Sequence, residues 1–170
     1  MPTPPTLAQL AQHVLLIRIT MHTTGKFFEA DTRSGNHSSI FLITSDQTSI
    51  RLNMTKAGPT DNMGTYTISF CAYTHSNTSV ADIDITPIQG LTAGHVTQLI
   101  TQNRRERYQL ARTGVGCRFW VSTVINDMAL AGYISSSSAT SASSARDMLR
   151  YNYSKGKQPQ FEEIVPGRFV

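Results

Sequence analysis

The feature that most constrains the fold is a series of five short runs rich in β-branched and aromatic residues in the first half of the chain. The runs are separated by stretches rich in Gly, Pro, Asn, Asp or Ser, a pattern typical of strands joined by turns and loops. Because residues 45–47 form a short turn, the second and third runs should pair as an antiparallel hairpin. Residues 24–36 and 55–64 read as loops. The expected strands span residues 13–23, 38–44, 48–54, 65–73 and 80–86.

Helical patterns occupy the second half of the chain. Thr92 can cap a helix over residues 93–103, and the strongest helical periodicity runs over residues 117–134. A last helix is expected over residues 145–154, whereas residues 104–111 fit either a strand or a helix. Strands followed by helices predict an α+β fold, with an antiparallel sheet of about five strands packed against two or three helices.

The composition excludes several classes of protein. Charged residues make up 15% of the chain, and the net charge of +4 is too small to indicate a nucleic-acid-binding protein. No apolar run approaches the ~18 residues of a membrane span, and no secretory signal is visible, so a cytoplasmic location is expected. The 170 residues suit one domain (1–170), in which the Ser/Ala-rich segment 135–144 should be flexible.

Cys117 is the first candidate for chemistry. It follows the Gly114-Val115-Gly116 break and opens the best helix, where free N–H groups and the helix dipole favour a thiolate. The same N–H groups could hold an oxyanion. The alternative is that Cys117 is a small core residue, as free cysteines on apolar helix faces usually are. The other cysteine, Cys71, lies in an expected strand and should be a reduced structural thiol.

His37 is the candidate base, because it follows a Gly-Asn turn and directly precedes an apolar strand. Asn53 on the paired strand could accept the Nδ1–H of the imidazole and fix its tautomer. Arg51 on the same strand suits a substrate carboxylate or an oxyanion. The alternatives are a turn histidine and a solvent-facing strand.

Other candidate substrate-binding residues flank the cysteine, namely Gly116, Arg118 and Trp120. A second signal is basic, since five arginines lie close together and alternate with aromatic residues. Such a cluster could bind an acidic partner, or it could be a solvated surface. No nucleotide-binding fingerprint and no metal-ligand spacing occur, so no cofactor or metal is expected. The arginines are Arg104, Arg105, Arg107, Arg112 and Arg118.

Three segments carry a resemblance to known proteins: 36–42 (NHSSIFL), 49–54 (SIRLNM) and 116–121 (GCRFWV). They resemble an uncharacterised family of small fungal domains, some of which occur in biosynthetic gene clusters, and this likeness spans most of residues 13–134. The order of His, polar residue and Cys is also similar to circularly permuted papain-like hydrolases and acyltransferases, the lecithin–retinol acyltransferase group. That likeness implies a permuted papain-like fold. The chain departs from that group at Asn53, where a second His is common in the group.

The expected function is a thiol-dependent hydrolase or an acyl or amide transferase, with Cys117 as nucleophile and His37 as base. The substrate would be a small, natural-product-like molecule, and neither nucleic acid nor a membrane is an expected partner. The number of subunits is open, and a homo-oligomer is compatible with the sequence. A second reading is a non-covalent cyclase, isomerase or small-molecule-binding protein of a fungal biosynthetic pathway, with Cys117 merely packed. A third is an inactive interaction domain that uses the arginine cluster.

Overall fold

The computed structural model describes residues 2–24, 36–58, 60–111 and 116–170. Most of the expected loop at 24–36, together with Gly114 and Val115, lies outside these residues. The helices are α1 (Leu7–Leu10), α2 (Ala93–Gln102), α3 (Cys117–Leu130) and α4 (Ala142–Met148). The longer strands are β1 (Leu16–Thr23), β2 (Asn36–Ile43), β3 (Ser49–Lys56), β4 (Gly64–Cys71) and β5 (Ser79–Ile85). The short strands are β6 (Tyr108–Gln109), β7 (Tyr151–Asn152), β8 (Gln160–Phe161) and β9 (Arg168–Phe169).

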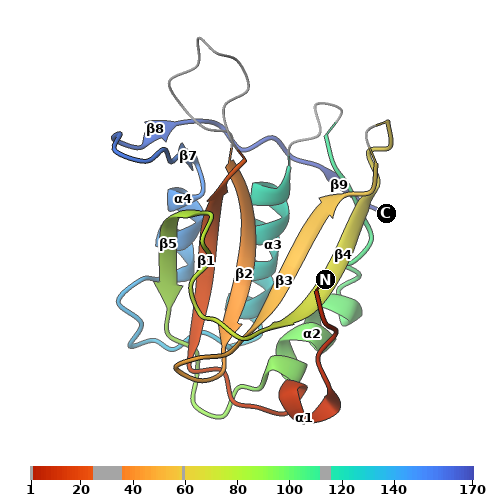
Figure 1. Ribbon diagram of the computed structural model, residues 1–170, viewed down its shortest axis with the longest axis vertical. Coiled ribbons are helices and arrows are strands. Elements are labelled where there is room, and N and C mark those ends of the chain that lie inside the picture. Colours follow the sequence, from red (N-terminus) through yellow and green to blue (C-terminus); the bar gives the residue numbers. More distant parts are fainter. Residues whose placement is uncertain (1, 25–35, 59, 112–115) are drawn as a thin grey trace.

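The five longer strands form one antiparallel sheet in the order β4-β3-β2-β1-β5 (Figure 1). This confirms the α+β prediction and the five strands expected from the sequence. The hairpin between β2 and β3 is also present, with Ile43 paired to Ser49 across the turn.

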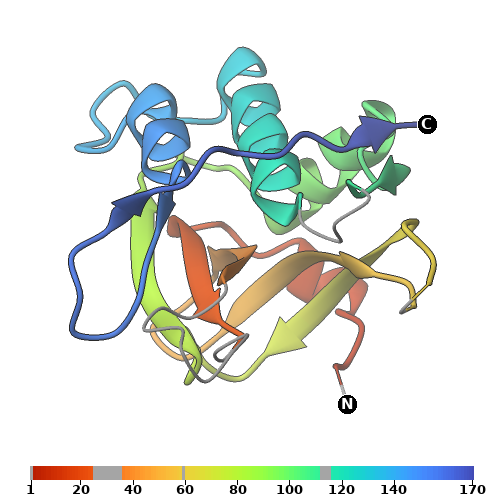
Figure 2. The same ribbon diagram turned by 90° about the horizontal axis from the view of Figure 1, so that it is seen from above.

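The sheet has two chemically different faces, because successive side chains of a strand point in opposite directions. Helices α2, α3 and α4 cover one face (Figure 2). That face supplies fully buried Ile, Leu and Met side chains, which pack against Trp120 and the valines of α3. Burial of each such side chain stabilises the fold by roughly 1.5–3 kcal/mol. The opposite face carries mostly polar groups and a small cluster of Phe41, Ile43 and Cys71.

The pairing of β2 with β3 is incomplete. β1 pairs with β2 along its whole length, from Asn36 to Ile43. β3 pairs with β2 only from Ile40 to Ile43, so the two strands diverge beyond the Ile40–Leu52 pair. Helix α3 lies behind this divergence, with its N-terminus at the same end of the molecule as the start of β2 (Figure 1). The sheet is therefore open at the point where α3 begins.

Several segments differ from the sequence-based expectation. The last helix begins at Ala142 rather than 145, because Ser141 caps it by accepting from the Ser144 N–H. Residues 104–111 contain only the two-residue strand β6, which pairs with β9 near the C-terminus. The flexibility of residues 135–144 stays a prediction; the segment hydrogen-bonds to the residue that follows β5, with Thr86 N–H donating to Ser138 Oγ at 2.9 Å.

No helix within the described residues is long and apolar enough to cross a membrane.

Candidate active site

Cys117 is the first residue of α3 and is 8% exposed. Gly116 precedes it as the N-cap, with a φ of 135° that favours glycine. Because glycine has no side chain, no side-chain cap occupies the first N–H groups of α3. The thiol therefore lies at the positive end of a 14-residue helix.

His37 and Asn53 lie on neighbouring strands, β2 and β3, where these strands diverge. The two side chains are joined by a hydrogen bond of 2.6 Å from His37 Nε2 to Asn53 Oδ1. The sequence pointed to Nδ1 as the nitrogen held by Asn53, and this is wrong. Since Asn53 takes Nε2, the nitrogen left to exchange a proton with Cys117 is Nδ1.

The structure brings Cys117 and His37 together, and each changes the pKa of the other. Burial alone raises the pKa of the Cys117 thiol, but hydrogen bonding with His37, the charge of His37 and the Ser38 backbone N–H bring it down to about 7. Burial alone lowers the pKa of His37, yet the interaction with Cys117 and the bond to Asn53 raise it overall. Both shifts favour the thiolate–imidazolium form of the pair near neutral pH.

His22 is a neighbour of this pair that the sequence did not single out. It lies directly opposite His37 in the β1–β2 register, and the two rings stack with centroids 5.9 Å apart. Its nitrogens bond to Thr78 Oγ1 at 2.8 Å and Ser39 Oγ at 2.6 Å. Burial, followed by the charges of Arg51 and His37, lowers the pKa of His22 to about 4. His22 is therefore neutral near pH 7, and His37 is the ring of the two that carries the charge.

Arg51 lies on the same face of β3 as Asn53, two residues before it. Its guanidinium is 5.6 Å from the centre of the Phe41 ring. Its positive charge lowers the pKa of both His22 and His37, which places it in the electrostatic surroundings of the pair.

Gly116 is held by a buried tyrosine that the sequence did not assign to the site. Tyr108 Oη donates to the Gly116 carbonyl at 2.8 Å and accepts from the Gly167 N–H at 2.9 Å. The C-terminal segment passes the end of the molecule where α3 begins (Figure 1). Tyr108 thus connects this segment to the residue that positions Cys117.

The side chains of Arg118 and Trp120, both expected to bind substrate, do not reach the pair. The Arg118 guanidinium binds the C-terminal region, with bonds to the Leu149 carbonyl at 3.0 Å and Glu162 Oε1 at 3.1 Å. Trp120 is fully buried in the core and donates to the Arg105 carbonyl at 2.7 Å. Helical geometry points these two side chains away from the site, one to the C-terminal segment and the other to the sheet.

The arginine cluster is not one continuous basic surface in the described part of the chain. Arg105 forms a two-fold ion pair with Asp127, at 2.6 and 3.0 Å. Arg118 is bound as described, and Arg112 lies outside the described residues. The second thiol, Cys71, is a free cysteine, as expected. It is buried beside Phe41 and Ile43, on the face of the sheet that the helices do not cover.

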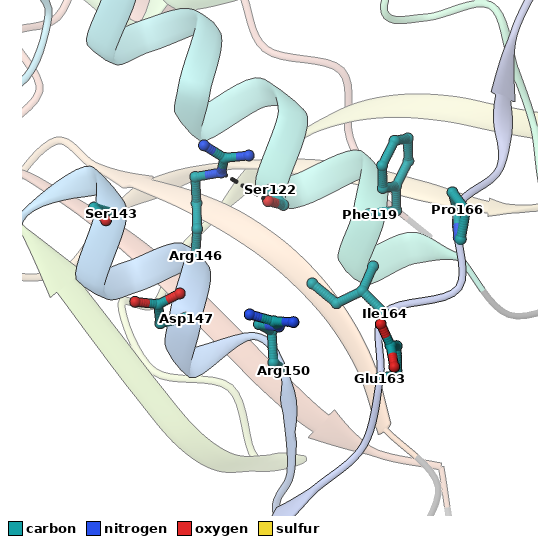
Figure 3. A pocket seen from close by; sticks show the side chains of 9 residues that line it. All are labelled: Phe119, Ser122, Ser143, Arg146, Asp147, Arg150, Glu163, Ile164 and Pro166. Carbon is teal, nitrogen blue, oxygen red and sulfur yellow. Dashed lines mark hydrogen bonds between the residues drawn. The ribbon is translucent and has the colours of Figure 1, made fainter.

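A separate pocket of about 490 Å³ lies between α4, the outer side of α3 and the C-terminal segment (Figure 3). It holds two arginines and two acids, and Arg146 donates to Ser122 Oγ at 3.0 Å. None of the predicted site residues lines it. Within the described residues, no group of three or more His, Cys, Asp or Glu side chains could hold a metal ion. The lining residues are Phe119, Ser122, Ser143, Arg146, Asp147, Arg150, Glu163, Ile164 and Pro166.

The fold and the site together define an α+β protein with a buried cysteine–histidine pair at the junction of sheet and helix. A family model for a domain of unknown function, DUF7770, matches residues 17–170, and the chain belongs to that family. No curated protein and no solved structure matches the chain.

Proposed function

We propose that this protein is a cysteine-dependent hydrolase or acyl or amide transferase that acts on a small molecule. The observation that carries the proposal is the Cys117–His37–Asn53 arrangement, in which the thiol at the start of α3 has a pKa of about 7. A thiolate is the nucleophilic form of cysteine, and a histidine fixed by an amide is a common partner for it.

In the proposed reaction, Cys117 Sγ attacks the acyl carbon and forms a thioester. The bond to the leaving amine or alcohol breaks, and His37 donates its Nδ1 proton to that group. Water, or an acceptor in a transfer reaction, then attacks the thioester while His37 takes up a proton, and the thiolate is regenerated. The uncapped N–H groups at the start of α3 would stabilise the oxyanion. Asn53 holds the imidazole in one orientation.

Three finer parts of the proposal come from the resemblance noted in the sequence. They are a natural-product-like substrate, a role in a fungal biosynthetic pathway and a relationship to permuted papain-like enzymes. The order of strand histidine, strand amide and helix cysteine supports the last of these, and fold-level analogy alone carries the other two. A cytoplasmic location is proposed on the sequence alone, which shows neither a membrane span nor a secretory signal.

The test is formation of an acyl-enzyme with p-nitrophenyl acetate. It is measured by the release of nitrophenolate and by mass spectrometry of the intact protein and its peptides. Wild-type protein should give a burst and an acetyl adduct on the Cys117 peptide. Cys117→Ala should give neither, and His37→Ala should lower the rate by about 10²–10⁴-fold because the thiol loses its base. The double variant should be little worse than either single variant, since residues that act as a unit are not additive. Asn53→Ala should cost less.

Cys71→Ala is the matched control, because it removes the other buried thiol and should leave the burst unchanged. The rival function is non-covalent binding or cyclisation with Cys117 as a packing residue, and the 8% exposure of Cys117 favours it. An adduct on Cys71, or a Cys117→Ala protein that keeps its burst, would support that rival.

A further inference from the structure

The guanidinium of Arg51 has no hydrogen-bond or ion-pair partner in the described part of the chain. Its Nε is buried without a hydrogen bond, and no carboxylate of the described residues lies within ion-pair distance. The guanidinium carbon lies over the Phe41 ring, 5.6 Å from its centre, and such a contact uses no N–H donor. Of the N–H donors, which lie in the plane of the group, Nε–H is the one that is buried without an acceptor. A buried donor without a partner is costly, so its retention calls for an explanation.

The other arginines of the packed region show how unusual this is. Arg18 binds Asp84 through two nitrogens, at 2.8 and 3.0 Å. Arg105 binds Asp127 in the same two-fold manner. Arg118 binds Glu162 and three backbone carbonyls. Among the described half-buried arginines, Arg51 is the one without an acceptor.

Arg51 also lies where an unmatched charge affects the proposed chemistry. It is on the face of β3 that presents Asn53, and its charge acts on His37 and His22. The described acids of this face, Asp82 and Asp84, lie on β5 at the edge of the sheet, where they are bound to Thr20 and Arg18 of β1. Among the described residues, neither acid pairs with Arg51, so its positive charge has no carboxylate partner there.

We propose that Arg51 binds a carboxylate of the substrate, so that the protein acts on acyl or amide compounds that carry an acidic group. A carboxylate fits the planar fork of a guanidinium with two parallel hydrogen bonds. It would also satisfy the buried Nε and balance the charge beside His37. This inference rests on the proposed function, because it takes Cys117 as the reacting atom.

The test compares two alkylating reagents of equal size, N-(2-carboxyethyl)iodoacetamide and N-(2-carbamoylethyl)iodoacetamide. In both, the Cys117 thiolate forms a C–S bond and displaces iodide, so only the charge of the arm differs. Wild-type protein should react about tenfold faster with the acidic reagent, after correction for the ratio given by free cysteine; a tenfold ratio corresponds to about 1.4 kcal/mol. Arg51→Gln should bring the ratio to that of free cysteine, and Arg51→Lys should keep part of the preference.

Arg150→Gln is the matched control, because it removes one positive charge from the separate pocket beside α4 and should leave the ratio unchanged. The ratio cancels any change in thiol pKa that the Arg51 substitution causes. Rapid labelling of Cys117 with no preference in wild-type protein would overturn the carboxylate site and leave the thiol chemistry intact. Failure of both reagents to label Cys117 would contradict the proposed function and this inference with it. If Arg51→Gln does not fold, the wild-type ratio and its loss at high salt decide the matter.

Discussion

At the scale of single residues, the site depends on two stacked histidines that behave in opposite ways. His22 is enclosed by hydroxyl groups and stays neutral, with a pKa of about 4. His37 has a raised pKa because Cys117 and Asn53 favour its charged form. Because His22 is neutral, the Cys117 thiolate is the main group that balances the positive charge of His37.

The pKa of Cys117 leads to a prediction for its reactivity. The thiolate fraction rises with pH, so the rate of labelling by iodoacetamide should rise through a midpoint near pH 7 and be lost as the pH falls below it. His37→Gln removes the interaction that lowers the pKa, and the midpoint should then move above the ordinary thiol value of about 8.5. His75→Gln is the control, because that ring is exposed and bound to Asp82. Equal midpoints in wild-type and His37→Gln proteins would contradict the pairing.

At the scale of elements, the start of α3 is held in place by the C-terminal segment through Tyr108. Gly167 passes so close to the Tyr108 ring that a methyl group there would clash with the ring and with the Gln109 carbonyl. Gly116 has a similar constraint, since its φ is positive and its Cβ would approach the Tyr108 hydroxyl. Both glycines are needed for close packing around the tyrosine.

Gly167→Ala should therefore lower the free energy of unfolding by about 1–3 kcal/mol, as forced overpacking does. Gly58→Ala is the control, because a Cβ at that position meets nothing within 4 Å, and it should stay within about 0.5 kcal/mol of wild type. Urea denaturation of both variants measures the difference. A Gly167→Ala protein as stable as Gly58→Ala would show that the C-terminal segment does not pack on Tyr108.

Much of the element structure could be predicted from the sequence, because alternating apolar residues define strands and Thr92 and Gly116 mark helix starts. The register of β1 against β2 could not, since β1 ends at Thr23 and β2 begins at Asn36, and a separation of that length in the sequence does not fix which residues face each other. This is why the cross-strand pair of His22 and His37 was missed. The two-residue strands β6 to β9 carry no periodic pattern at all. At the site, the sequence places Trp120 near Cys117 but does not show where its side chain points, and in the structure that side chain lies in the core.

At the scale of the whole molecule, ion pairs differ in what they hold together. Arg105 and Asp127 join the segment after α2 to α3, and the Asp127 side chain is 8% exposed. Arg18 and Asp84 lie on the open face of the sheet, where the Asp84 side chain is 41% exposed. Water can replace the second pair more easily than the first.

Arg105→Leu should lower the free energy of unfolding by roughly 2–4 kcal/mol, because it leaves a buried carboxylate without its partner. Arg18→Leu should cost about 1 kcal/mol or less, as exposed pairs usually do. Thermal and urea unfolding of the two variants, measured side by side, gives the comparison. Equal losses would mean that Asp127 finds another partner or water when Arg105 is removed.

Because β2 and β3 diverge, the contact between Cys117 and His37 depends on how the helices pack on the sheet. The thiol belongs to the helical layer and the imidazole to the sheet, and they meet only where the sheet is open behind β2. A loosened state could keep every helix and strand and still separate the two groups, because such states lose side-chain packing before secondary structure. Far-ultraviolet circular dichroism would not distinguish that state from the native one. The pKa of Cys117 would distinguish the two states, because it depends on the contact with His37. Cys117 therefore reports whether the helices and the sheet are packed together.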